Sequence, residues 1–438
     1  MRLLLALFAT LLVPIVATAQ TPPAASVKAA PELEARIAEL PTLLMGGGDY
    51  NASFSAAFRT AVPKETFATI GTQLSTSDGK VTGIERITPA SAWSAVVLVG
   101  YERGIATMQI VADPAPPHQI TGLLITGMSA REATLGAVID TLAKLPGVTG
   151  FAFARLDAAG PVMLQSRAPD RGLAIGSEFK LVILAELVRS ISAGERRWED
   201  EITLAGTGLP GGAYMSSPAG TKVSLYDLAE KMISVSDNSA TDILLKLAGR
   251  AKVEAMLGTV GIADPAGMRP FLSTLELFKL KGASGGALGE RWAGLDEAGR
   301  RALLDGDVAR LPVSAINPAL FASGKPIRVG SIEWFASPAD MVRVMDWLRR
   351  HTESGPAARA REILAKNSGV GAGPAGRWQY LGFKGGSEPG VIAMTFLLQG
   401  KDGHWYAMSG SWNDVAAPVD EGRFAGLMAR AVELAAGS

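Results

Sequence analysis

The spacing of apolar positions divides the first part of the chain into helices followed by strands. Helical spacing predicts one helix over Pro31–Leu44 and a second, broken near Pro63, over Ala52–Leu74. Runs rich in Val, Ile and Thr then predict strands at Lys80–Ile87, Ala92–Tyr101, Ile105–Val111 and Gln119–Ile125. This order predicts a small α+β domain over residues 27–128, of the cystatin-like or nuclear-transport-factor-like kind. Because it gathers no polar cluster, we expect it to position or bind rather than to catalyse.

From about residue 129 the pattern changes to strands, a long helical middle, and strands again. The predicted elements are a helix at about 131–144, strands at Gly147–Leu156, Val162–Gln165, Tyr380–Lys384, Val391–Leu398 and Trp405–Trp412, and a final helix at Glu421–Ala436. Strands at both ends of this segment make the order of the sheet discontinuous in sequence. We therefore expect residues 129–438 to form an α/β sandwich with a helical subdomain inserted between its strands.

Residues 1–19 have the pattern of a secretory signal. Arg2 provides a positive start, Leu3–Val16 is apolar, and Ala17–Ala19 fits a small-x-small cleavage site. The alternative is an uncleaved membrane anchor, which the short apolar run disfavours. Elsewhere no stretch approaches the ~20 apolar residues of a spanning helix. We expect an exported protein, periplasmic or secreted, with no membrane span after signal removal.

Composition and charge exclude several classes of function. Lys plus Arg equals Asp plus Glu, at 42 each, and no basic run appears, so a nucleic-acid partner is not expected. The chain has no Cys, which excludes disulfides, thiolate metal sites and a cysteine nucleophile. With only three His residues, a His-rich metal site is also excluded. We expect neither a metal nor a cofactor.

Ser177 and Lys180 begin a strongly apolar predicted helix. Apolar residues cover nearly all of its sides, so we expect it to be buried. Residues three apart share a helix face, which points Lys180 toward Ser177. Burial lowers the pKa of an ammonium group, so a neutral Lys180 could accept the Ser177 proton, while the helix N-terminus offers N–H groups to an oxyanion. The same spacing at Ser77–Lys80 lies in a polar turn, and we interpret it as structural.

A second polar motif, Ser-Asp-Asn at 236–238, falls between predicted helices at about 225–234 and 240–248. Such a short break can hold Ser236 as a proton relay and Asn238 as an amide donor. Taken alone, the triplet is explained as well by an interhelix turn with an N-cap.

A third motif, Lys-Gly-Gly-Ser at 384–387, ends a late predicted strand. Glycine there lets a substrate lie along the strand edge, and the Ser387 N–H can donate to an oxyanion. Lys384 would bring positive charge to a substrate carboxylate and to the Ser236 hydroxyl. Taken alone, this motif is explained equally well by a β-turn after the strand.

Together and in this order, the three motifs resemble those of penicillin-binding proteins and serine β-lactamases. Leu228–Leu245, LAEKMISVSDNSATDILL, is also similar to the matching segment of class A β-lactamases, and EWFASPADMVRVM at 333–345 resembles the helix before their late strands. The resemblance covers about 129–438. It implies a β-lactamase-type sandwich, with an antiparallel sheet and a helical subdomain, preceded by the small α+β domain.

The resemblance also implies a role for each matched residue. Ser177 would be acylated, with Lys180 as base and Ser236 as the relay to the leaving group. The substrate-binding residues would be Asn238 for the amide, Lys384 for the carboxylate, Gly386, Ser387, and Tyr214 as an aromatic wall. For Tyr214 a packed surface position is an equally good explanation.

The chain departs from the class A pattern in the loop that carries the deacylating Glu and a following Asn. Here residues 268–276 read MRPFLSTLE, and Glu276 is the nearest carboxylate. General-base catalysis typically contributes ~10²–10⁴-fold, so its loss would slow deacylation. Gly385 also replaces the usual Thr or Ser, and the separation of the last two motifs is longer than a compact β-lactamase needs. These features resemble the β-lactamase-fold esterase of clavulanic acid biosynthesis.

We therefore expect an exported serine hydrolase of the class A β-lactamase-like family that acylates Ser177 with a small β-lactam or related amide or ester and hydrolyses it. The alternatives are a carboxylesterase cleaving cephalosporin-type esters, and a slowly deacylating penicillin-binding D-Ala-D-Ala peptidase or sensor acting on cell-wall peptides. From another class, Gly282–Gly286 matches the G-x-S-x-G of α/β-hydrolases, but neither His351 nor His404 has an evident orienting acid.

Overall fold

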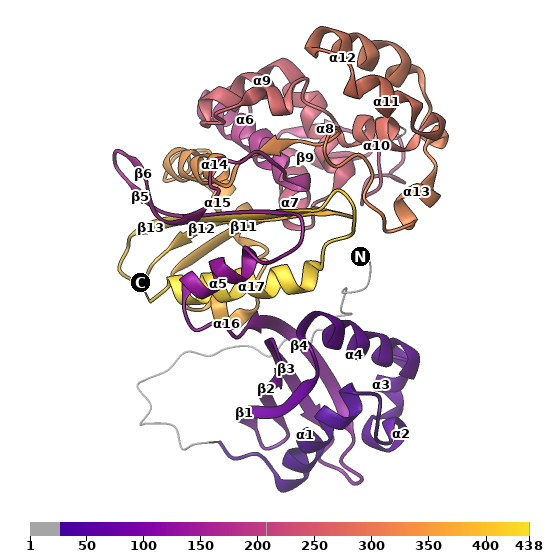
Figure 1. Cartoon of the computed structure of the whole chain (residues 1–438), viewed down its shortest axis with the longest axis vertical. Helices are drawn as coiled ribbons and strands as arrows, with labels where there is room; N and C mark the ends of the chain where they lie inside the picture. Colours follow the sequence, from indigo (N-terminus) through magenta and orange to yellow (C-terminus); the bar gives the residue numbers. More distant parts are fainter. Residues whose placement is uncertain (1–26, 207, 438) are drawn as a thin grey trace.

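A computed structural model describes residues 27–206 and 208–437 (Figure 1). The predicted signal at 1–19 lies outside the described residues. Within the described ranges, no helix combines the length and the apolar character needed to cross a membrane.

The N-terminal unit packs helices against an antiparallel sheet of order β1-β2-β3-β4. Its elements are α1 Pro31–Leu44, α2 Tyr50–Ser53, α3 Ala56–Ala61, α4 Lys64–Asp78, β1 Val81–Ser91, β2 Ser94–Tyr101, β3 Gly104–Ala112 and β4 Ile120–Ala130. Leu33, Ile37 and Leu40 recur on one face of α1 and are fully buried. Alternate residues of β2, such as Val97 and Val99, are buried in the same cluster. This unit is the expected α+β arrangement, while its likeness to cystatins or nuclear transport factors stays a prediction.

The second predicted helical stretch, at Ala52–Leu74, is broken near Pro63 as predicted and has one further break, so that it forms three helices. The Asp49 carboxylate accepts hydrogen bonds from two backbone N–H groups and begins α2, and the Ser55 hydroxyl accepts from Phe58 N and begins α3. Pro63 stands before the first residue of α4. Each break therefore coincides with a residue that begins a helix rather than continues one.

The second unit is built on a five-stranded antiparallel sheet of order β11-β12-β13-β5-β6. The strands are β5 Val148–Asp157, β6 Gly160–Arg167, β11 Tyr380–Glu388, β12 Val391–Gln399 and β13 Trp405–Asn413. Strands from the two ends of the segment therefore meet as predicted, through the pairing of β13 with β5. The strand predicted to end at Lys384 continues to Glu388, because Gly385–Glu388 pair with β12 in unbroken register.

Helices cover both faces of this sheet (Figure 1). One face carries α5 Leu135–Leu142 and α17 Glu421–Ala435, and the other carries α14 Pro338–His351 and α15 Arg359–Ala365, with α6 Lys180–Ser192 packed on α14. The inserted helical subdomain includes α7 Leu225–Ser234, α8 Asn238–Ala248, α9 Arg250–Thr259, α10 Thr274–Gly282, α11 Ala287–Ala293 and α12 Glu297–Leu303. The arrangement is a β-lactamase-like α/β fold of sheet plus helices.

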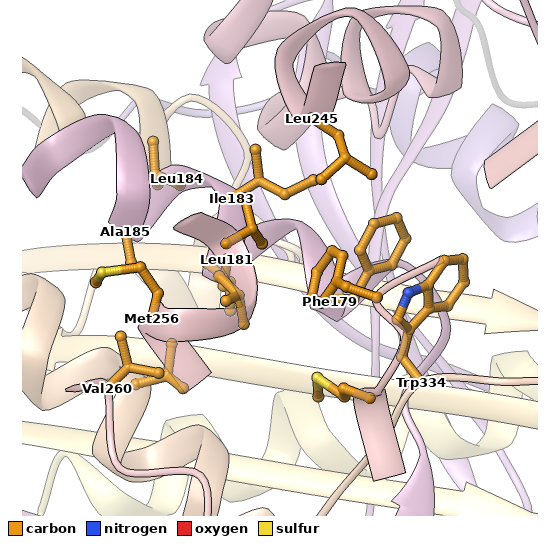
Figure 2. Packing of buried hydrophobic residues seen from close by; sticks show 14 of the residues in the cluster. Phe179, Leu181, Ile183, Leu184, Ala185, Leu245, Met256, Val260 and Trp334 are labelled. Carbon is orange, nitrogen blue, oxygen red and sulfur yellow. The ribbon is translucent and has the colours of Figure 1, made fainter. Parts of the chain in front are cut away.

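Helix α6 is buried on nearly all sides, as its composition predicts. Figure 2 shows its apolar residues among side chains of α8 and α9, including Leu245 and Met256. Immediately before α6, the Phe179 ring stacks on Trp334 with centroids 3.6 Å apart. The start of α6 is therefore held by packing from both the sheet and the subdomain.

The N-terminal unit contacts the second unit mainly through α17, which lies against β4 and α4. Ser77 Oγ donates to the Asp420 carboxylate at 2.9 Å, and Arg423 Nη1 donates to Arg103 O at 3.1 Å. The Ser77–Lys80 copy of the Ser-x-x-Lys spacing thus contributes to this interface, in agreement with its structural interpretation.

The burial of α6 predicts the stability of a matched pair of variants. Leu184→Ala removes a fully buried side chain and should lower the free energy of unfolding by about 2–5 kcal/mol. Leu164→Ala makes the same change on β6, where the side chain is 45% exposed, and should stay within about 1 kcal/mol. Chemical denaturation of both variants checks this, and equal effects would contradict the burial of α6.

Candidate active site

The candidate nucleophile lies where the β11 backbone touches the turn before α6. This turn is a 3₁₀ helix, η1 Gly176–Phe179, and α6 begins at Lys180. A Cβ on Gly386 would overlap the carbonyl of Ile175 and the amide of Ser177, so only glycine fits there. Gly176 has φ +48°, and a Cβ on it would lie 3.1 Å from Ser387 N. The amides of Ser177 and Ser387 are therefore close neighbours, as an oxyanion-binding pair requires.

Lys180, the first residue of α6, is fully buried, and its side chain bonds to the Ser-Asp-Asn loop. Its Nζ donates to Ser236 O at 2.7 Å, Ser236 Oγ at 3.0 Å and Asn238 Oδ1 at 2.8 Å. Burial, and then the nearby Lys384 charge, hold the pKa of Lys180 well below its ordinary value. None of these hydrogen-bond acceptors is a carboxylate, so the site favours a neutral amine.

Ser236 lies between two lysines. Lys384 Nζ donates to Ser236 Oγ at 3.0 Å, the same distance as from Lys180 Nζ. The Ser236 backbone has φ +58°, an uncommon conformation for a non-glycine residue that is typical of functional sites. Ser236 Oγ accepts a hydrogen bond from each of the two lysines, so its own O–H can donate to a third group.

The Ser-Asp-Asn loop is fixed by its middle residue. The Asp237 carboxylate accepts from Ala240 N at 2.8 Å and so begins α8, and it also accepts from Ala213 N at 2.5 Å. The N-cap explanation is therefore correct for Asp237, while its two neighbours face Lys180. Tyr214 follows Ala213, is partly buried against the core, and does not line the cavity next to Ser177.

Glu178 is a site residue that the motifs did not reveal. Its side chain is fully buried, and among the described residues neither carboxylate oxygen has a hydrogen bond of normal geometry. Burial raises the pKa of Glu178 to about 8, against the opposing effects of Thr395 and Lys384. Burial likewise lowers the pKa of Lys384 to about 8, while Glu178 acts to raise it. In the sequence, the feature that could have indicated Glu178 is a charged residue at the start of an otherwise apolar helix.

A cavity of about 90 Å³ opens beside Ser177. Among its lining residues are the predicted Ser177, Asn238 and Ser387. Two carboxylates that the motifs missed, Glu333 and Glu388, also line it. A larger cavity of about 220 Å³, around Arg269 and Trp292, contains none of the predicted site residues. We take the smaller one as the candidate site because it contains the nucleophile.

Glu276 is the nearest carboxylate in the loop at 268–276, and both of its oxygens already have partners outside the cavity. One oxygen pairs with Arg250 at 2.5 Å, and the other accepts from Ser273 N in the capping box that begins α10. Arg269, in the same loop, reaches the Glu254 carbonyl. In residues 27–206 and 208–437, no three His, Cys, Asp or Glu side chains gather as metal ligands.

The G-x-S-x-G match at Gly282–Gly286 does not form a strand-to-helix elbow. It begins at the last residue of α10 and continues through a 3₁₀ turn into α11. The α/β-hydrolase alternative requires a strand before the serine, so this part of the chain does not support it.

The chain is similar to one known family and to several solved structures. The model of a family described as the beta-lactamase enzyme family matches residues 132–368. Similar solved structures include a β-lactamase from Sphaerobacter thermophilus DSM 20745, with 19% identity and a TM-score of 0.47 over 69% of this chain and 94% of that one. Others are a β-lactamase from Chitinophaga pinensis DSM 2588 (16%, 0.46, 70% and 99%) and PBP-A (14%, 0.45, 69% and 94%). No curated protein matches significantly.

Burial of Glu178 predicts how stability changes with pH. The pKa rises from about 4.5 unfolded to about 8 folded, so between these values the unfolded chain loses a proton that the folded chain keeps. Stability therefore falls as pH rises through this window, by roughly 3–5 kcal/mol for this group. Glu178→Gln should remove that part of the fall, as measured by denaturation at pH 4.5 and 8. The exposed Glu32→Gln is the control, and parallel profiles for all three proteins would contradict the prediction.

Proposed function

The chain belongs to the beta-lactamase enzyme family, and from this premise we propose that it is an exported serine hydrolase that acylates Ser177. One observation carries the proposal. The Ser236 hydroxyl lies 3.0 Å from both Lys180 Nζ and Lys384 Nζ, and Lys180 begins α6 three residues after Ser177, whose amide neighbours that of Ser387. A nucleophile, a base, a relay and an oxyanion site are then within one small region, as acyl transfer requires.

In the proposed acylation, Ser177 Oγ attacks the carbonyl carbon of the substrate and passes its proton to neutral Lys180. The developing oxyanion accepts from the N–H groups of Ser177 and Ser387. The proton then moves from Lys180 through the Ser236 hydroxyl to the leaving nitrogen or oxygen, and the carbonyl–leaving-group bond breaks. The 3.0 Å contact between Lys180 Nζ and Ser236 Oγ supports this route.

The substrate we propose is a small molecule, a β-lactam or a related amide or ester. Asn238 would donate its amide to the substrate, while Lys384 would attract a substrate carboxylate beside Gly386. The fully buried Lys384 donates to Ser236 Oγ and Gly385 O and forms no ion pair with an acidic side chain among the described residues, so a carboxylate is a suitable counter-ion. Periplasmic or secreted location remains a prediction based on residues 1–19, and a binding or positioning role remains one for residues 27–128.

A second candidate, a slowly deacylating penicillin-binding peptidase or sensor, is favoured by one observation. Glu276 is held by Arg250 and by its own capping box, so the loop offers no free carboxylate to activate water. Carboxylesterase activity is the third candidate. Penicillins, cephalosporins, acyl esters and a D-Ala-D-Ala peptide, assayed in one hydrolysis panel, separate these activities.

Removal of the nucleophile tests the proposed function directly. Ser177→Ala should form no covalent adduct with benzylpenicillin and should lose at least ~10³-fold in ester or β-lactam hydrolysis. Intact-mass spectrometry and a nitrocefin or nitrophenyl acetate assay measure the two effects. Ser77→Ala makes the same change in the other Ser-x-x-Lys copy and should retain both activities. Turnover by Ser177→Ala at the wild-type rate would refute the assignment.

The lowered pKa of Lys384, about 8, predicts a pH-dependent preference between substrates. Below about pH 8 its ammonium attracts a carboxylate, and above that value the attraction is lost. The KM of benzylpenicillin should therefore rise above pH 8, while that of neutral nitrophenyl acetate should not. Lys384→Ala should raise the benzylpenicillin KM roughly 10-fold at pH 7 and flatten its pH dependence. The same rise with both substrates would contradict this role.

A further inference from the structure

A buried lysine and two glutamates converge on the wall of the Ser177 cavity. Lys281 Nζ, from α10, lies 2.6 Å from Glu333 Oε1 and 2.5 Å from Glu388 Oε1. The side chains of Lys281 and Glu333 are 0% and 1% exposed, whereas that of Glu388 is 20% exposed. Both glutamates line the cavity that contains Ser177. The cluster therefore reaches the cavity through the carboxylate that remains partly accessible.

The position of Glu388 follows from the register of β11. Side chains alternate between the faces of a strand, so Lys384, position 386 and Glu388 point to the same face. On this face Lys384 reaches Ser236, and Gly386 touches the backbone of Ser177. Glu388 is two residues farther along and follows Ser387, whose amide neighbours that of Ser177. Its carboxylate thus stands on the side of β11 from which an ester on Ser177 can be approached.

The charge of the cluster is unbalanced. One ammonium faces two carboxylates, and a second Glu333 oxygen is buried without a hydrogen bond among the described residues. Glu333 as a whole is 94% buried and lines the cavity, so its orphaned oxygen marks a place for a proton or a polar ligand such as water. A cavity of about 90 Å³ is large enough for a water molecule, which occupies ~30 Å³ in the liquid.

Other carboxylates near the site are either hydrogen-bonded elsewhere or absent from the cavity lining. Glu276 is in its capping box, Asp242 accepts from Thr274 N and Leu275 N, and Glu178 does not line the cavity. Glu333 is held by Lys281 and almost closed to solvent. By this comparison Glu388 is the carboxylate best able to reach a water molecule in the cavity.

We propose that Glu388 is the general base of deacylation, with Lys281 and Glu333 as positioning residues that orient its carboxylate. The inference rests on the proposed acylation of Ser177 and supplies the step that follows it. Ionised Glu388 takes a proton from a water molecule as the water oxygen bonds to the acyl carbon. The oxyanion accepts from the amides of Ser177 and Ser387. The bond between the acyl carbon and Ser177 Oγ then breaks, the proton returns to Ser177 Oγ, and the free acid leaves.

The surroundings of Glu388 determine how this step depends on pH. The charged groups that face it are Lys281 from α10 and Glu333 from the segment before β10 Phe335–Ala336, while Val391 opposite it on β12 is apolar. Burial, and then the Glu333 charge, raise the pKa of Glu388 well above its ordinary value, and Lys281 opposes them. Burial acts to lower the pKa of Lys281, but the two carboxylates outweigh it. Deacylation should therefore accelerate as pH rises.

The test separates formation of the adduct from its release. Wild type and Glu388→Gln are acylated with benzylpenicillin and, separately, with nitrophenyl acetate, and the Ser177 adduct is followed by intact mass. Glu388→Gln should still form the adduct, which also shows that it folds, and should release it ~10²–10⁴-fold more slowly. Glu276→Gln neutralises the loop carboxylate as a matched control and should release the adduct at the wild-type rate. Release by Glu388→Gln within about threefold of wild type would overturn the proposal.

A second variant tests the positioning role and does not depend on the first. Glu333→Gln removes the negative charge beside Glu388 and should lower the pKa of Glu388. Release of the adduct should therefore accelerate at a lower pH than in wild type, a shift that a purely structural role of Glu333 would not produce. An unmoved inflection would overturn the role of the cluster. A wild-type adduct that is never released would also overturn it, while supporting the sensor function. Failure of every probe to acylate Ser177 would instead refute the proposed function, and the base with it.

Discussion

The contact between the β11 backbone and the turn before α6 is the constraint on which the site depends. Two glycines, Gly176 and Gly386, allow these two segments of the backbone to approach without an intervening side chain. The contact places the Ser177 amide beside that of Ser387. Lys384, also on β11, then lies within hydrogen-bond distance of Ser236. A sheet and a helical subdomain that are distant in sequence are thereby joined at the candidate nucleophile.

Around this contact the protein buries several ionisable groups, and their protonation follows from that burial. Lys180, Lys384 and Glu178 are each fully buried, and burial shifts the pKa of each toward its neutral form. The Lys281 cluster differs because it keeps direct ion pairs. One side of the site therefore holds buried groups without an ion-pair partner among the described residues, and on the other side Lys281 holds two carboxylates in direct ion pairs. Both arrangements reduce stability relative to an apolar core, which is typical of functional sites.

Much of the fold could be predicted from the pattern of apolar residues. Pro31–Leu44 forms a helix with the predicted bounds, and the strands of both units lie within a few residues of their predicted positions. The main error in the sheet was the end of β11, because glycine weakens a local strand signal while pairing with β12 continues through it. In the second helical stretch the predicted break near Pro63 is confirmed, but the break at Phe54–Ser55 was missed because the capping Ser55 was taken as helix interior.

The sequence predicted those site residues that belong to short motifs, but not those that come together from separate elements. The three motifs led to Lys180, Ser236, Asn238 and Lys384, whose contacts depend on one loop and one strand. Glu178 was passed over because a charge at a helix start usually faces solvent, and only the sheet behind it shows that it is buried. Lys281, Glu333 and Glu388 come from three separate elements, so no spacing in the sequence marks their meeting. Tyr214 had a plausible position but lies outside the cavity.

Asp420 has a consequence for how the molecule unfolds. The same oxygen accepts from Arg423 N, where it caps α17, and from Ser77 of the N-terminal unit. Helix α17 also covers the sheet that carries β11. Melting of the α17 terminus and release of the N-terminal unit are therefore linked equilibria. The two units should lose their structure in a shared cooperative transition rather than as independent domains.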